Sequence, residues 1–220
     1  MTTTPPRPSA PARRSSRGGR AVLVLAIALL LVLLVRTFVV QSFSIPSDSM
    51  QPTLDPGERV LVWRVDATDV RRGDVIVFDG TGTFADTPAA PRGLARLGAG
   101  IGELLGFRPG ESDYVKRVVG LPGDRITCCD AQGRLLVDGQ PLEEPYVHPG
   151  DAASDVEFDI AVPEGRLWVM GDHRSDSVDS RSHLGSPGGG TIALEDVIGR
   201  VVAITWPLGA AGTVERGNGS

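Results

Sequence analysis

Hydrophobic positions divide the chain into two parts. Residues 21–40 form an apolar run that only Arg36 and Thr37 interrupt. Twenty residues of α-helix rise about 30 Å, the thickness of the hydrocarbon core of a bilayer. The run therefore predicts one transmembrane helix. The residues before it, 1–20, are rich in Pro, Ser, Thr, Arg and Gly, and we expect them to form a disordered tail.

After the apolar run, the pattern changes to short segments rich in β-branched and aromatic residues, which is typical of strands. These segments are residues 59–63, 74–78, 114–119, 125–128, 134–137, 166–170 and 199–206. Turn sequences such as Asp138-Gly139 separate them, and the two segments that flank residues 130–133 are predicted to form a hairpin. The pattern predicts a mainly β domain over residues 41–210, followed by a flexible tail at residues 211–220.

Residues 80–112 interrupt this strand pattern. Apolar residues at helical spacing favour a helix within residues 92–107, although several glycines in the same stretch disfavour one. The spaced residues are Leu94, Leu97, Ile101, Leu104 and Leu105. We interpret the segment as a variable insertion that either packs on the β domain or lies on the membrane surface.

The charges are divided at the same place as the hydrophobic pattern. Six of the 22 basic residues lie within residues 1–40, where there is no Asp or Glu, and the other 16 share residues 41–220 with all 27 acidic ones. A basic segment before an apolar run stays in the cytoplasm. The acidic balance of the remainder argues against nucleic acid as a partner.

The apolar run also differs from a cleavable signal peptide. It is longer than the roughly 7–15 apolar residues of such a peptide, and no small-x-small cleavage site follows it closely. We therefore expect a retained signal anchor and a single-pass protein of the cell membrane. Its partner is the lipid bilayer, its N-terminus is cytoplasmic, and its β domain is extracytoplasmic.

The two cysteines of the chain, Cys128 and Cys129, are adjacent. This spacing fits neither a zinc site nor a disulfide framework. Two interpretations stay open: the pair is two small buried hydrophobic side chains, or it forms a vicinal disulfide in an oxidising compartment. Both interpretations give the cysteines a structural role.

Candidate chemistry begins directly after the apolar run, with Ser47 and Ser49 between two prolines. A base for such a serine is suggested by Lys116, the only lysine in the chain, which lies in an apolar strand segment. Buried lysine can lose its proton, whereas arginine cannot, and a base active near pH 8 needs a pKa lowered by roughly 2–3 units. The pattern favours a Ser–Lys pair; the alternative is an ordinary strand lysine that reaches solvent.

Histidine offers a second kind of base. The chain has His148, His173 and His183, and His173 directly follows Asp172. A Ser–His–acid triad is therefore conceivable, but neighbours in the sequence do not establish one. We prefer the Ser–Lys pair.

Four sequence blocks, in order and behind an N-terminal anchor, resemble the bacterial type I signal peptidases. They are residues 47–54 (SDSMQPTL), 72–78 (RGDVIVF), 114–124 (YVKRVVGLPGD) and 171–181 (GDHRSDSVDSR). The resemblance implies a membrane-anchored, β-rich serine endopeptidase that removes signal peptides from secreted preproteins. It implies acyl transfer that needs no metal and no cofactor.

The resemblance also implies a role for individual side chains. Ser49 corresponds to the nucleophile and Lys116 to its general base. The hydroxyl of Ser47 and the backbone N–H of Ser49 form the oxyanion hole, and Ser177 orients the lysine. These roles predict that the four side chains lie close together in the folded chain.

Further positions correspond to supporting and substrate-binding residues of the family. Asp179 and Arg181 correspond to a structural ion pair. The expected walls for small substrate side chains at positions −1 and −3 are Ile45, Pro46, Met50, Tyr114 and Val115. The chain departs from the family pattern at His173, where many members have Asn, and at Asp48, where Gly is frequent.

Two rival functions are less consistent with the sequence. A self-cleaving repressor-type hydrolase also uses a Ser–Lys pair, but it carries an N-terminal DNA-binding domain where this chain has an apolar run. A membrane-anchored binding or assembly module of the same fold would have no use for the complete set of site residues.

Overall fold

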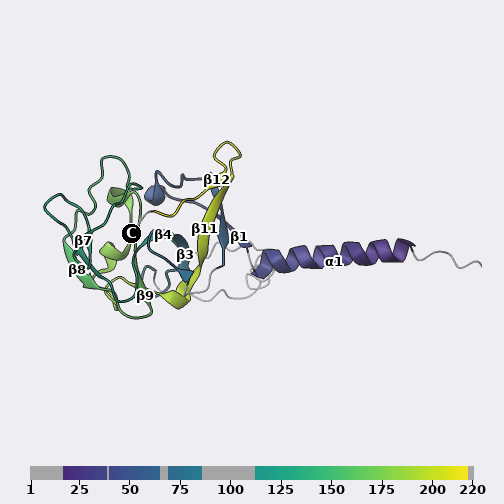
Figure 1. The fold of residues 1–220 in the computed structure, drawn as a ribbon, viewed down its shortest axis with the longest axis horizontal. Coiled ribbons are helices and arrows are strands. Elements are labelled where there is room, and N and C mark those ends of the chain that lie inside the picture. Colours follow the sequence, from purple (N-terminus) through teal and green to yellow (C-terminus); the bar gives the residue numbers. More distant parts are fainter. Residues whose placement is uncertain (1–16, 39, 65–68, 86–111, 218–220) are drawn as a thin grey trace, which may run out of the picture.

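The computed structural model describes residues 17–38, 40–64, 69–85 and 112–217 (Figure 1). A single long helix projects from a β-rich body. The predicted helix within residues 92–107 lies outside the described residues. So do residues 1–16 of the predicted tail.

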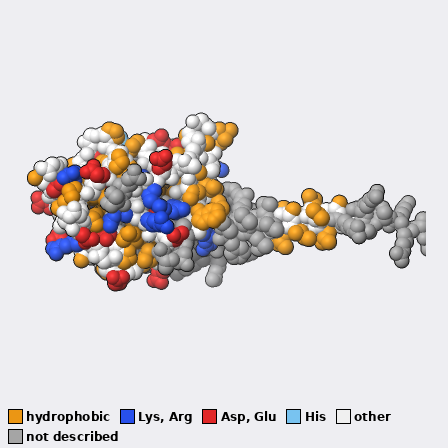
Figure 2. All heavy atoms as spheres, viewed as in Figure 1, with side chains coloured by type: hydrophobic (Ala, Val, Ile, Leu, Met, Phe, Trp, Pro, Cys, Tyr) orange, Lys and Arg blue, Asp and Glu red, His pale blue; other side chains and the backbone are white. Residues whose placement is uncertain are grey.

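The long helix, α1, spans Arg17–Phe38. It begins four residues earlier than the predicted span, so Arg17 to Arg20 are helical rather than part of a disordered tail, and Val40 already belongs to the first strand. Its large apolar side chains that are described, between Val22 and Leu30, are all exposed (Figure 2).

None of the helices in the described part of the chain combines the length and the apolar character needed to cross a membrane.

The body consists of two antiparallel sheets, which confirms the prediction of a mainly β domain. The larger sheet has the order β1-β2-β11-β3-β4-β9-β10, with β12 on β11. Its strands are β1 (Val40–Ser44), β2 (Arg59–Trp63), β3 (Val75–Asp79), β4 (Asp113–Gly120), β9 (Arg166–Met170), β10 (Ile192–Ala193), β11 (Val197–Trp206) and β12 (Gly212–Thr213). Acidic and basic side chains are mixed over one face of the body (Figure 2).

The smaller sheet has the order β7-β6-β5-β8. Its strands are β5 (Arg125–Cys128), β6 (Leu136–Val137), β7 (Gln140–Pro141) and β8 (Phe158–Ala161). The predicted hairpin is confirmed, because Ile126 pairs with Val137 across β5 and β6. Short 3₁₀ helices connect strands in the described part of the chain: η1 (Asp48–Met50), η3 (Arg174–Asp176), η4 (Ser180–His183) and η5 (Leu194–Asp196).

Strand β4 lies at the centre of the fold. It pairs with β3 on one side and β9 on the other, and hydrophobic clusters cover both of its faces. Val118 belongs to one cluster and Val119 to another, as the alternation of side chains along a strand requires. The second half of β4, from Lys116 to Gly120, is therefore buried.

The C-terminal residues 211–217 differ from the predicted flexible tail at residues 211–220, of which residues 218–220 lie outside the described residues. Strand β12 pairs with β11, and beyond it the N–H of Val214 donates to the carbonyl of Val202 at 3.0 Å. The N–H of Gly217 donates to the carbonyl of Gly73 at 3.1 Å. The domain therefore extends to residue 217, because the backbone N–H groups of Val214 and Gly217 donate to carbonyls that precede them by more than ten residues.

The two adjacent cysteines are bonded to each other. Cys128 is half-buried and Cys129 is exposed. Of the two interpretations of the sequence, the structure therefore contains the vicinal disulfide and not a pair of buried thiols.

Candidate active site

The short helix η1 presents Ser49 at the end of an anchored turn. Its two hydrophobic neighbours, Met50 and Leu54, are buried in the cluster that β1, β2 and β3 share. The N–H of Leu54 donates to the carbonyl of Met50 at 2.9 Å, which closes the turn. Upstream, the N–H of Ile45 donates to the carbonyl of Glu58 at 2.9 Å. Burial of side chains on both sides of Ser49 thus fixes its backbone, because a packed core tolerates little movement.

Lys116 approaches this turn from strand β4, where it pairs with Ile76 of β3. Its side chain is buried, with 4% of its surface exposed, and its Nζ lies 2.7 Å from the Oγ of Ser49. The Oγ of Ser47 lies 3.3 Å from the same oxygen. Two residues that are 67 positions apart in the sequence therefore form a direct hydrogen bond.

The pKa of Lys116 is lowered from 10.5 to about 8. Burial is the main cause, because it disfavours the charged ammonium. Asp179, Asp172 and Asp176 oppose this shift, and Arg181 adds to it. A substantial fraction of the amine is therefore neutral near pH 8, in hydrogen-bonding distance of a hydroxyl, which is the arrangement that a general base requires.

Gly171, which follows β9, packs directly against the turn that carries Ser49. A Cβ at this position would lie 2.5 Å from the carbonyl oxygen of Ser49 and 2.2 Å from the Oγ of Ser177, both far closer than a side chain allows. Two residues on, the N–H of His173 donates to the same Ser49 carbonyl at 3.1 Å. The absence of a side chain at Gly171 thus lets the loop after β9 contact the turn.

Ser177 lies beside Gly171, with its hydroxyl oxygen buried. Within the described residues this oxygen has no well-aligned hydrogen-bond partner, although it is near enough to help lower the pKa of Asp179. The hydrogen bond formed by Lys116 is to Ser49. The lysine-orienting role of Ser177 therefore stays a prediction.

Asp179 and Arg181 form the expected ion pair, which caps η4. The guanidinium donates from Nε to Oδ1 at 2.9 Å and from Nη2 to Oδ2 at 2.8 Å. Burial alone would raise the pKa of Asp179, but Arg181 and the N–H of Gly171 donate hydrogen bonds to it and bring it below its ordinary value. The pair holds the loop that carries Gly171.

The structure contains a second buried ion pair that sequence reasoning left without a role. Arg117, next to Lys116, donates to Asp172 from Nε at 2.7 Å and from Nη2 at 2.6 Å. The ring of Tyr146 stacks on its guanidinium at 4.0 Å, and Thr53 donates a hydrogen bond to Asp172. Arg117, Asp172 and Thr53 each lie in one of the four sequence blocks, and this position in a block was the feature of the sequence that could have indicated them. Tyr146 lies in none of the blocks.

Comparison with known proteins shows the family of the chain. The sequence model of the family described as "Signal peptidase, peptidase S26" matches residues 19–206. The chain belongs to this family.

Individual relatives are bacterial type I signal peptidases. The chain is 37% identical over 234 residues to the signal peptidase I of Mycobacterium tuberculosis strain H37Rv, covering 94% of this chain and 79% of that protein. It is 35% identical over 247 residues to a probable signal peptidase I of Mycobacterium leprae, covering 96% and 84%. A signal peptidase I structure from Enterococcus faecalis V583 has a TM-score of 0.39 at 22% identity, over 60% of this chain and 96% of that one.

The expected substrate-binding residues fall in two places. Ile45, Met50 and Val115 lie in one hydrophobic cluster next to Ser49, and Pro46 is exposed beside them. Tyr114 packs in a different cluster, where its ring contacts Phe78 and Phe84 and its hydroxyl donates to the carbonyl of Phe84 at 3.2 Å. Alternation along β4 explains the separation, because neighbouring side chains point to opposite faces.

The alternative Ser–His–acid triad is not formed by the described residues. The ring of His173 stacks on that of His148, and His173 reaches Ser49 through its backbone N–H. Asp172 is occupied by Arg117, and His183 packs on Phe84 with ring centroids 4.6 Å apart. The titratable side chain that is hydrogen-bonded to Ser49 is that of Lys116.

Proposed function

We propose that the chain is a membrane-anchored endopeptidase that cleaves signal peptides from preproteins, with Ser49 as nucleophile and Lys116 as general base. The observation that carries this proposal is the 2.7 Å separation between a buried Lys116 Nζ with a lowered pKa and the Ser49 Oγ. Membership of the signal peptidase family supplies the class of substrate.

The proposed reaction is acyl transfer. Neutral Lys116 accepts the hydroxyl proton as the Ser49 Oγ attacks the scissile carbonyl. The resulting ammonium then protonates the leaving amine, which is the new N-terminus of the mature protein. Water attacks the acyl-enzyme with Lys116 again as base, and Ser49 is regenerated.

The oxyanion of the tetrahedral intermediate needs donors near the nucleophile. The Ser47 hydroxyl, 3.3 Å from the Ser49 Oγ, and the Ser49 backbone N–H are the proposed donors. Loss of one donor in sites of this kind lowers the rate by about 10²–10³-fold. Ser177, buried next to Gly171, is proposed to help hold the lysine once substrate is bound.

The proposed anchor is the apolar run at residues 21–40. Its described side chains are exposed and apolar, and such a surface is stable only when another apolar phase covers it. Anchoring would hold the enzyme beside substrates whose own apolar segments lie in the bilayer, which raises their effective concentration. Five arginines before the run favour a cytoplasmic N-terminus and an outer catalytic domain.

The substrate is proposed to carry small side chains at positions −1 and −3. The apolar residues Ile45, Met50 and Val115 form the proposed wall beside Ser49. These three side chains are buried or half-buried and packed against one another, so the space beside them admits only small substrate side chains.

Cleavage of a model preprotein by the full chain in detergent tests the proposal. Replacement of either dyad member, in Ser49→Ala or Lys116→Arg, is expected to lower kcat/KM by at least about 10⁴-fold, because the nucleophile or its neutral base is lost. Ser42→Ala, at an exposed position of β1, serves as the matched control and should cleave normally. Normal cleavage by the Ser49 variant would exclude the mechanism. Labelling of Ser49 by a serine-directed acylating probe separates an enzyme from a binding module.

A further inference from the structure

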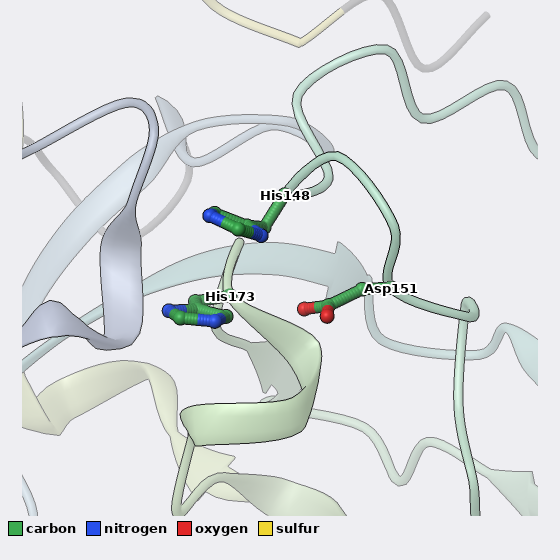
Figure 3. Close-up of side chains that lie close together, drawn as sticks. All are labelled: His148, Asp151 and His173. Carbon is green, nitrogen blue, oxygen red and sulfur yellow. The ribbon is translucent and has the colours of Figure 1, made fainter.

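Two histidines and a carboxylate gather next to the nucleophile turn, and the proposed reaction uses none of these side chains. His148 and Asp151 come from the loop between β7 and β8, and His173 comes from the loop after β9 (Figure 3). The imidazole rings stack with their centroids 4.1 Å apart, and the Asp151 carboxylate points toward them. One ligand atom from each of the three residues lies within 4.8 Å of the other two.

Backbone hydrogen bonds fix the positions from which these side chains project. The N–H of His148 donates to the carbonyl of Asp172 at 2.9 Å, and the N–H of Asp151 donates to the carbonyl of His148 at 3.0 Å. The N–H of His173 donates to the carbonyl of Ser49 at 3.1 Å. The side chains themselves are only half-buried, so they can turn while their backbones stay in place.

Two further observations indicate that the cluster is arranged for a ligand. Ser175 donates to both carboxylate oxygens of Asp151, from its N–H at 3.1 Å and from its hydroxyl at 2.8 Å. Carboxylates that bind metal ions are commonly oriented by such hydrogen bonds. In addition, the Nδ1 of His173 is buried and has no hydrogen-bond partner within the described residues. A buried polar atom without a partner is unfavourable, which favours occupation of the site.

We propose that His148, Asp151 and His173 bind one divalent ion of the Zn²⁺ class, at a site separate from the Ser49–Lys116 pair. Two imidazoles and one carboxylate suit Zn²⁺, Co²⁺, Ni²⁺ and Cu²⁺, whereas Mg²⁺ and Ca²⁺ prefer oxygen ligands alone. Ligand atoms on one tetrahedral Zn²⁺ lie about 3.4 Å apart, since each bond is about 2.1 Å. The ligand atoms lie within 4.8 Å of one another, so the rings turn out of their stack and bring these atoms to that spacing when the ion binds.

The ion would link two loops that both contact the active site. One loop carries His148 and Asp151; the other carries Asp172, which pairs with Arg117, and His173, which bonds to Ser49. A ligand that binds only the folded state stabilises it by an amount that grows with its concentration above Kd. The site thus acts as a clamp on the loops around the nucleophile and takes no part in the peptide-bond chemistry.

Metal titration of the full chain in detergent tests this proposal. The protein carries a purification tag without histidine, is freed of metal with a chelator, and is titrated with ZnCl₂ by calorimetry and with CoCl₂ by visible absorption. We expect one ion per chain and a melting temperature that rises with Zn²⁺. His148→Ala and Asp151→Asn should each weaken Zn²⁺ binding by at least about tenfold and remove the rise in melting temperature.

Two control variants make the result specific. His183→Gln alters the remaining histidine of the chain, which lies outside the cluster, and should bind Zn²⁺ as the wild type does. Ser49→Ala removes the nucleophile and should also bind normally, so that failure of the metal site and failure of the proposed peptidase activity are distinguishable. Wild-type protein without saturable Zn²⁺ binding, or a His183→Gln variant that loses as much affinity as His148→Ala, would overturn the proposal.

Discussion

At the scale of single residues, burial decides what Lys116 can do. Three aspartates near its ammonium would keep it charged, yet desolvation outweighs them and brings the pKa to about 8. Arginine cannot respond in this way, because its guanidinium stays protonated at any pH that a protein tolerates. The one lysine among 22 basic residues thus stands where burial makes its proton removable.

The pH dependence of cleavage follows from this shift. The base must be neutral, so kcat/KM should be low at pH 6, rise about tenfold per pH unit as pH approaches 8, and level off above it. The pH-rate profile of single-turnover preprotein cleavage between pH 6 and 10 measures this. A profile that is flat over the whole interval would contradict a lysine base with this pKa.

At the scale of elements, the loop after β9 owes its position to one glycine and two ion pairs. Gly171 allows the loop to touch the Ser49 carbonyl, and the Asp179–Arg181 and Asp172–Arg117 pairs hold the loop from both sides. Strand β4 supplies Lys116 and Arg117 together, so the proposed base and the partner of Asp172 are neighbours on one strand.

Replacement of Gly171 by alanine should therefore impair catalysis. The added Cβ would lie 2.5 Å from the Ser49 carbonyl and must displace the turn, and a displacement near 1 Å in an active site costs about 10²-fold in rate. Gly185→Ala is the matched control, because nothing lies within 4 Å of a Cβ there. Measurement of kcat/KM for the two variants, with circular dichroism as a check on folding, decides the matter; equal activities would show that the contact is unimportant.

Burial also separates two ion pairs of the same chemical type. Arg117–Asp172 is almost completely buried, whereas Arg125–Asp159, with a similar two-pronged geometry, is largely exposed. Asp172→Ala leaves a buried charge unpaired and should lower the free energy of unfolding by about 3–5 kcal/mol. Asp159→Ala should have little effect on it, because solvent screens an exposed pair. Urea unfolding of both variants tests the contrast, and similar losses would refute it.

At the scale of the whole molecule, the C-terminal segment, residues 211–217, pairs with the larger sheet through β12 and bonds to Gly73. Gly73 accepts hydrogen bonds on its carbonyl from both Gly217 and Arg117, and Arg216 donates to Asp74 at 2.6 Å. The last described residues are thus connected to the strand that carries Lys116 through a single carbonyl group.

Truncation measures the contribution of this segment. Removal of residues 212–220 deletes β12 and the bonds of Val214, Arg216 and Gly217 to the body. With about 1 kcal/mol for each of three hydrogen bonds, the free energy of unfolding should fall by about 3 kcal/mol. Removal of residues 218–220 alone is the control and should have little effect. Urea unfolding curves that coincide for the two truncated chains would show that the segment adds nothing.

Local patterns in the sequence predicted several of the strands and the family, but not β1, β7, β8, β10 or β12. β-Branched runs and turn sequences predicted β2, β5 and β9 with their observed bounds, and the hairpin of β5 with β6, because these features depend on neighbours in the chain. Four motif blocks indicated the signal peptidase family, and the isolated lysine indicated the residue that contacts Ser49.

Only the tertiary structure decided what joins distant residues. The contact of Lys116 with Ser49, the pairing of Arg117 with Asp172, the docking of residues 212–217 and the gathering of His148 with His173 each connect parts of the chain that are far apart in sequence. The structure also separated Tyr114 from the other expected wall residues. Such contacts arise when sheets and loops pack, and a local pattern of side chains contains no information about which distant strand will lie beside it.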